Sequence, residues 1–122
     1  MLTQRLLREY PKRGQIFIAD LDPSFGREIH KKRPVLIISN NQINEIYPVV
    51  IVIPFSSIVP EFIGPDIVKF ISQKGLNEDS ILIVNQIISV DKDRLLKRVS
   101  RISAVKMKQV EQALKNVLGL DL

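Results

Sequence analysis

Two uninterrupted aliphatic runs most constrain the fold of this chain. VLIIS, residues 35–39, and PVVIVIPF, residues 48–55, carry apolar and largely β-branched side chains without polar alternation. Strands of this kind are typically buried on both faces, because a strand with one face in water alternates apolar and polar residues. Pro54 predicts that the second run ends at a sheet edge or at a bend. The two runs therefore predict buried strands at the centre of the fold.

Shorter apolar runs between turn residues predict further strands. These runs are QIFIAD (15–20), DIVKFIS (66–72) and SILIVNQIIS (80–89). The segments between them, NNQIN and QKGLNEDS, are predicted as turns, the first with room for one helical turn after it. About five strands in 122 residues indicate a single domain.

Helices are predicted at both ends of the chain. Leucines at helical spacing over residues 2–10 predict an N-terminal helix that Pro11 ends. Ser103 can cap a second helix that runs through Leu118, and Gly119 can end it. The apolar face of this second helix is predicted to comprise Met107, Val110, Leu114, Val117 and Leu118. The expected fold class is α+β, a small, strongly curved β barrel with one helix packed on it.

The charge balance indicates the kind of partner. Eighteen Lys and Arg face thirteen Asp and Glu, for a net charge of +5. A small basic domain often binds a polyanion, because neutralising phosphates releases counterions. The lack of cysteine excludes disulfides and thiolate metal sites, and one histidine argues against zinc. No apolar run approaches the ~20 residues of a membrane span, and no signal peptide is recognisable, so we expect a cytoplasmic protein.

Common catalytic patterns are scarce. Asp20 and Asp22 could be metal ligands at a strand end, but no second carboxylate cluster completes such a site. A strand end followed by an Asp-Pro turn is the favoured interpretation. The chain has no Gly-rich phosphate loop. Ser56 and Ser57 follow a strand, yet no histidine lies in a serine-hydrolase context, so by themselves they are interpreted as turn residues.

Three separated motifs resemble the MazF/PemK/Kid toxin family. The first is KRGQIFIADLDPSFGREIHKKRPVLIISNN, which contains D-P-x-x-G-x-E and then R-P-V followed by aliphatics. The second, VVIVIPFSS, is similar to a family strand that ends in Thr or Ser. The third, EDSILIVNQIISVDKDRL, carries Gln-Ile and a Val-Asp-Lys-x-Arg-Leu close. Together the motifs cover roughly residues 12–118.

The resemblance implies a toxin of a toxin–antitoxin pair. Such toxins are homodimers with an SH3-like barrel, here of about five to seven strands in one domain, 1–122, with residues 1–11 as an N-terminal extension. They cleave single-stranded RNA without a metal or cofactor. The ribose 2′-OH attacks the adjacent phosphate and leaves a 2′,3′-cyclic phosphate and a 5′-OH. The expected partner is a cognate acidic antitoxin that runs over the loop 24–32.

The resemblance also supplies candidate site residues. Arg33 matches the family's catalytic arginine, whose planar fork can contact two phosphate oxygens as negative charge grows on the phosphorane. Ser56 matches the catalytic Thr or Ser, and its hydroxyl can orient the 2′-OH or donate to a phosphate oxygen. Glu28 matches the acid of G-x-E and is a candidate for the base or for an RNA contact. The candidate RNA-binding residues are Arg27, His30, Lys31, Lys32 and Gln86.

Two points stay open. Many relatives carry charged residues where this chain has Ile83, Asn85 and Ile88, so no cleavage sequence can be transferred from a relative. The second point is the activity, because CcdB-like toxins share the barrel and bind a protein target such as DNA gyrase without cutting RNA. A nuclease-dead relic that binds only RNA or an antitoxin is a third class. Arg33 before a proline and a hydroxyl at Ser56 favour the nuclease.

Overall fold

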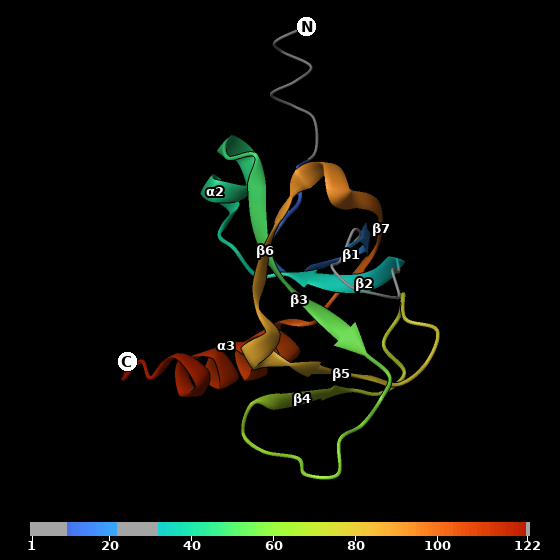
Figure 1. The fold of residues 1–122 in the computed structure, drawn as a ribbon, viewed down its shortest axis with the longest axis vertical. Helices are drawn as coiled ribbons and strands as arrows, with labels where there is room; N and C mark the ends of the chain where they lie inside the picture. Colours follow the sequence, from blue (N-terminus) through green and yellow to red (C-terminus); the bar gives the residue numbers. More distant parts are fainter. Residues whose placement is uncertain (1–9, 22–31, 122) are drawn as a thin grey trace, which may run out of the picture.

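The computed structural model describes residues 10–21 and 32–121, in which seven strands form one antiparallel sheet (Figure 1). The strands are β1 (Gln15–Asp20), β2 (Lys32–Ile37), β3 (Val49–Ser56), β4 (Ile67–Phe70), β5 (Ser80–Ile83), β6 (Ile88–Asp91) and β7 (Leu95–Arg101). The helices are α2 (Asn41–Ile46) and α3 (Ala104–Leu118), with 3₁₀ turns η1 (Val84–Gln86) and η2 (Lys92–Arg94). The α+β class is as predicted.

Strand β3 connects the parts of the sheet. The strand order is β4-β5-β3-β2-β1-β7, and β6 pairs with β3 outside this path. One edge of β3 pairs with β6 over residues 49–52 and then with β5 at Phe55 and Ser56. The other edge pairs with β2. The C-terminal end of β3 is thereby held between β2 and β5, which is where the candidate site lies.

Pro54 lies inside β3 and is buried opposite Val35 of β2, at a point where the other edge of β3 has no partner among the described strands. The physical reason is the change of partner along β3. Val52 is the last residue paired with β6, and Phe55 is the first paired with β5. Between them no neighbouring strand needs the N–H that proline lacks.

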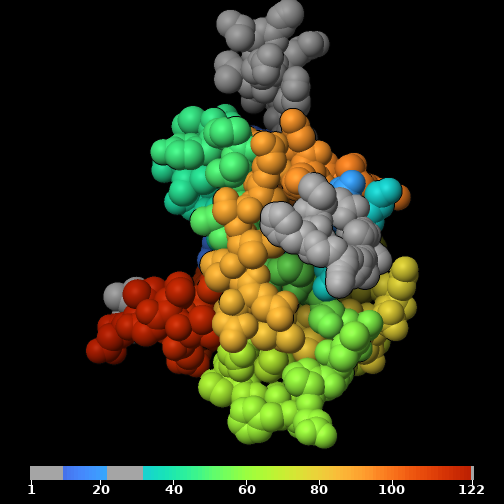
Figure 2. All heavy atoms as spheres, in the orientation of Figure 1, coloured from blue at the N-terminus to red at the C-terminus, as the bar shows by residue number. Residues whose placement is uncertain are grey.

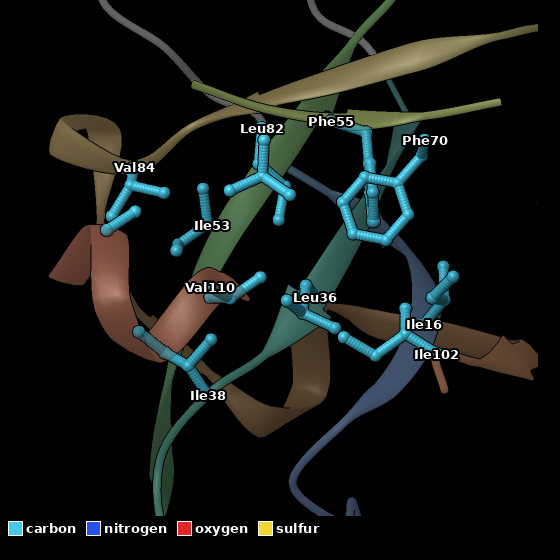
Figure 3. Packing of buried hydrophobic residues seen from close by; sticks show 12 residues of the cluster. Ile16, Leu36, Ile38, Ile53, Phe55, Phe70, Leu82, Val84, Ile102 and Val110 are labelled. Carbon is cyan, nitrogen blue, oxygen red and sulfur yellow. The ribbon is translucent and has the colours of Figure 1, made fainter. Parts of the chain in front are cut away.

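The buried side chains form two clusters on opposite faces of β2. Val35 and Ile37 belong to a smaller cluster with residues of β1, β3 and β6, whereas Leu36 belongs to the larger one. The predicted burial of this strand on both faces is confirmed. Figure 3 shows the larger cluster, in which the rings of Phe55 and Phe70 meet edge to face with centroids 5.2 Å apart.

Helix α3 covers the larger cluster and follows its predicted bounds. Ser103 Oγ accepts a 3.1 Å hydrogen bond from the Lys106 N–H, and Gly119 ends the helix with φ 70°. The residues it buries are Val110 and Ala113. Met107, Leu114 and Val117 pack against the cluster as predicted, but Leu118 is 53% exposed. The apolar face therefore ends before the last helical residue.

The run 80–89 is not one strand, contrary to prediction. It divides into β5 and β6 at η1, where the Val84 N–H donates to the Asp66 carbonyl over 2.8 Å. Val84 is fully buried, which fixes this turn against the core. The turn lets both pieces pair with β3. Strand β7 was not predicted at all, because LLKRVSR is only partly buried and shows no clean alternation.

The segment after β2 contains a buried polar pair. α2 begins after Asn40, whose side chain accepts from the Ile43 N–H, so the predicted turn includes a short helix. Asn44 of α2 is fully buried and hydrogen-bonded to the hydroxyl and carbonyl of Ser39. The predicted N-terminal helix lies outside the described residues, apart from Tyr10. Within the described part of the chain, no helix is long and apolar enough to span a membrane.

Candidate active site

Strand pairing brings the Arg33 end of β2 beside the Ser56 end of β3. β2 and β3 are antiparallel, with Leu36 opposite Ile53 and Val35 opposite Pro54. Arg33 and Ser56 each lie two residues beyond this last pair. Antiparallel neighbours bring the start of one strand beside the end of the other. The two residues for which the sequence motifs imply a catalytic role therefore lie near the same end of these strands.

Both residues line an open pocket of about 250 Å³. Its walls come from the start of β2, the end of β3 and the β4–β5 loop. In Figure 2 this loop, in yellow, adjoins the green segment at the end of β3 on one side of the molecule. The lining residues are Arg33, Pro34, Phe55, Ser56, Ser57, Ile58, Leu76, Asn77, Glu78 and Ser80.

Arg33 is the cationic group among the described lining residues. It is exposed near the start of β2, where Ala19 of β1 is its neighbour in the sheet. None of the described residues forms an ion pair with it. A guanidinium carries five N–H donors in a planar fork, a geometry that suits two oxygens of one phosphate.

Ser56 is held by the turn that follows β3. The Ile58 N–H donates to Ser56 Oγ over 3.1 Å, while the return contact from Oγ to the Ile58 carbonyl is long, at 3.5 Å. The first bond occupies an acceptor position of the hydroxyl and fixes its orientation. The hydroxyl proton makes only the long contact, so a ligand oxygen in the pocket can compete for it.

Glu78 provides a carboxylate in the same pocket and was missed by sequence reasoning. Its segment, QKGLNEDS, was interpreted as a turn, which it is: no strand or helix covers residues 71–79. Only the pairing of β5 with β3 indicates that Glu78 belongs to the pocket, because Ile81 of β5 faces Ser56 of β3. That register brings the residues just before β5 beside the end of β3.

Of the other candidate residues, Lys32 and Gln86 are described, and neither lines the pocket. Lys32 is exposed on β2, opposite Asp20. Gln86 is exposed in η1, which follows the end of β5, whereas Ser80 at the start of β5 lines the pocket. The residues of the basic loop, Arg27, Glu28, His30 and Lys31, lie outside the described residues, as does Asp22.

No metal centre is formed by the part of the chain that the structure describes. Those residues contain no group of three or more His, Cys, Asp or Glu side chains that could hold an ion. Asp20, one of the two carboxylates weighed as ligands, stands at the end of β1 and its carbonyl accepts a hydrogen bond from Arg94. Among the described lining residues, the polar side chains are one guanidinium, three hydroxyls, the carboxamide of Asn77 and one carboxylate.

The fold and the pocket define a small β-rich protein with an open pocket, lined by Arg33 and Ser56, near the start of β2 and the end of β3. A family model described as PemK-like, MazF-like toxin of type II toxin-antitoxin system matches residues 12–118. The chain belongs to this family.

Individual relatives agree with this assignment. The chain is 36% identical over 110 residues to the Endoribonuclease MazF of Staphylococcus saprophyticus, covering 89% of this chain and 92% of the relative. Its fold is similar to an endoribonuclease in complex with its cognate antitoxin from a mycobacterial species, with TM-score 0.76, 25% identity and coverage of 92% and 98%. A MazE–MazF crystal structure from Deinococcus radiodurans has TM-score 0.78 at 20% identity, covering 93% and 100%, and supports the fold alone.

Proposed function

We propose that this protein is an endoribonuclease toxin of a type II toxin–antitoxin system. It cleaves single-stranded RNA at short sequences without a metal. The 2′-OH attacks the adjacent phosphate, and the products carry a 2′,3′-cyclic phosphate and a 5′-OH. The observation that supports this most is the pocket in which Arg33 and Ser56 meet, in a chain whose 36%-identical relative is an endoribonuclease.

Arg33 stabilises the transition state in this proposal. As the 2′-oxygen bonds to phosphorus, negative charge grows on the non-bridging oxygens, and a fixed guanidinium is most useful there. β2 holds the Arg33 backbone by pairing with β1, so little reorganisation is needed when RNA binds. A guanidinium stays protonated in proteins, so Arg33 does not act as a general base.

Ser56 orients the reacting phosphate or the 2′-OH. Its hydroxyl is already fixed by the Ile58 N–H, and its proton can pass from the long contact with the Ile58 carbonyl to an RNA oxygen. Glu28 stays a candidate for the base or an RNA contact. Arg27, His30, Lys31, Lys32 and Gln86 stay candidates for binding the rest of the strand. A net charge of +5 favours the approach of that strand.

The size of the pocket supports a dimeric assembly. The pocket has a volume of about 250 Å³, and a groove between two copies would offer more surface for several nucleotides. We therefore infer a cytoplasmic homodimer of SH3-like barrels, each a single domain, 1–122, with residues 1–11 as an extension. Its partner is a cognate acidic antitoxin. The mycobacterial structure to which the fold is similar is an endoribonuclease in complex with its cognate antitoxin, which supports a partner of this kind. The gyrase-binding, CcdB-like alternative is not favoured, because the relatives are ribonucleases.

One experiment tests the activity. Purified protein is incubated with a long RNA in EDTA, and the 5′-OH ends are mapped. Cuts at a recurring short sequence, with a cyclic phosphate on the upstream fragment, are expected. Cleavage that requires an added metal, or intact RNA beside inhibited DNA gyrase, would reject the proposal.

A further inference from the structure

The carboxylate of Glu78 is unexpected in a pocket that binds phosphate. Glu78 and Arg33 are the charged residues among the described lining residues. A carboxylate repels a phosphate by roughly 1 kcal/mol at 4 Å in water, and by more where water is excluded. Phosphate binding alone therefore gives no reason for an acid at this position, whereas a proton-accepting step does.

The loop that carries Glu78 is tightly fixed. Asp79 Oδ1 accepts a 2.8 Å hydrogen bond from the Ser72 N–H, which closes the loop across its base. Gly75 has φ +92° and lies directly against Ser100 and Val99 of β7. Leu76, next in the chain, packs against the larger core cluster. The loop is thus anchored at its base and middle, as expected for a segment that positions a functional group.

Glu78 itself is held through its backbone. Ser80 Oγ, in a residue that is only 7% exposed, donates to the Glu78 carbonyl over 3.0 Å. No ion pair within the described residues joins Glu78 to Arg33. An ionised carboxylate has acceptor oxygens only, so Glu78 can take a proton or a hydrogen bond from a substrate group.

We propose that Glu78 is a catalytic residue, the general base that accepts the proton of the ribose 2′-OH. As that proton passes to a Glu78 oxygen, the 2′-oxygen forms its bond to phosphorus, and the P–O5′ bond breaks with its electron pair leaving on O5′. O5′ takes a proton from solvent water, and the Glu78 carboxyl returns its proton to water. Arg33 bears the charge on the non-bridging oxygens throughout. This inference rests on the proposed ribonuclease function.

The decisive comparison is between two variants with the same charge change. Glu78→Gln removes the base, while Glu61→Gln removes an exposed carboxylate of the β3–β4 segment that does not line the pocket. Cleavage sites are first mapped with the wild-type protein, and short RNAs containing one site are then used. We expect kcat to fall about 100-fold or more in Glu78→Gln, the scale of general base catalysis, and to stay within about 3-fold in Glu61→Gln.

Two further measurements separate catalysis from binding. Affinity for an RNA with a 2′-deoxyribose at the cut site should be unchanged or higher in Glu78→Gln, because a negative charge is removed. A substrate with sulfur in place of the 5′-bridging oxygen has a leaving group that needs no proton, and it should not restore cleavage by Glu78→Gln. Full restoration would place Glu78 at the leaving group and overturn the assignment.

The possible failures are distinguishable. If the wild-type protein does not cleave RNA, the proposed function itself is wrong. If the wild type cleaves and folded Glu78→Gln cleaves within about 3-fold of it, Glu78 is not the base, and loss of activity in Glu28→Gln would then move the role to Glu28. Weakened binding of the deoxy analogue together with a changed cleavage sequence would make Glu78 a base-reading residue instead.

Discussion

Gly75 lies so close to Ser100 that a Cβ added to Gly75 would be 2.6 Å from the Ser100 Cβ. This contact joins the β4–β5 loop, which carries Glu78, to strand β7. Gly14 has the same φ of +92° but nothing within 4 Å of the corresponding Cβ position. Alanine substitutions at the two glycines therefore allow the free-energy cost of backbone strain to be distinguished from that of a steric clash.

Alanine at these positions should destabilise the protein to different extents. Gly14→Ala adds backbone strain, about 1 to 3 kcal/mol for a residue in a sparsely populated region. Gly75→Ala adds a further 1 to 3 kcal/mol or so, because the new methyl group overpacks against Ser100 and β7. Urea denaturation of both variants measures the difference. Equal free energies of unfolding would mean that the loop moves away from β7 at little cost.

Arg33→Ala should reduce cleavage by about 100-fold or more, the scale of losing one preorganised charge stabiliser. Arg33→Lys should recover only part of this loss, because an ammonium lacks the planar fork that contacts two oxygens. Lys97→Ala is the matched control, an exposed cation on β7 that does not line the pocket. Rates on one mapped RNA, with thermal unfolding to confirm the fold, provide the comparison. Near-normal cleavage by folded Arg33→Ala would remove Arg33 from the mechanism.

Ser56 should be replaceable by threonine but not by alanine. Threonine keeps the hydroxyl that contacts Ile58 and that contacts RNA in the proposed mechanism, so activity should persist. Alanine removes it, and the rate should fall roughly 10-fold or more, with the loss in kcat if the hydroxyl acts in the transition state. Single-turnover cleavage of one RNA by the three proteins is the measurement. An alanine variant as fast as wild type would leave Ser56 as a turn residue only.

Where local patterns decide the structure, the sequence predicted it. QIFIAD became β1 within the predicted bounds, and α3 starts after Ser103 and ends before Gly119, because caps and periodicity act within a few residues. The division of residues 80–89 at η1 was not predictable in this way. It depends on Asp66, which accepts the Val84 N–H, and on the space beside β3, both of which are tertiary effects.

The candidate site also contains residues that the sequence motifs identified and one that they did not. Arg33 and Ser56 were candidates because they match residues of the MazF/PemK/Kid motifs, and both line one pocket. Glu78 opens the third motif, but the resemblance implied no role for it, and an acid in a turn is usually solvated. Only the register of β5 against β3 reveals that this turn closes the pocket. Gln86 shows the opposite case, a motif residue that η1 places beyond the far end of β5.

The last prediction concerns the antitoxin. A neutralising partner must block a surface that attracts phosphates, and an acidic, mostly unstructured segment can do so by folding on contact and covering a large area. We expect it to run over the loop 24–32 of a homodimer and to compete with RNA for the pocket of Arg33. Because charge steers the encounter, its association rate should fall steeply as salt rises, while the dissociation rate changes less.

We expect the antitoxin to be a small protein encoded beside this one, and its binding is measured by stopped flow at several salt concentrations. The wild-type toxin is compared with Arg33→Ala and Lys97→Ala. Removing a charge at the mouth of the blocked surface should slow association more than removing one on β7. Crosslinks that place the antitoxin wholly on a face away from Arg33, in a complex that still binds RNA, would show that inhibition works by another route.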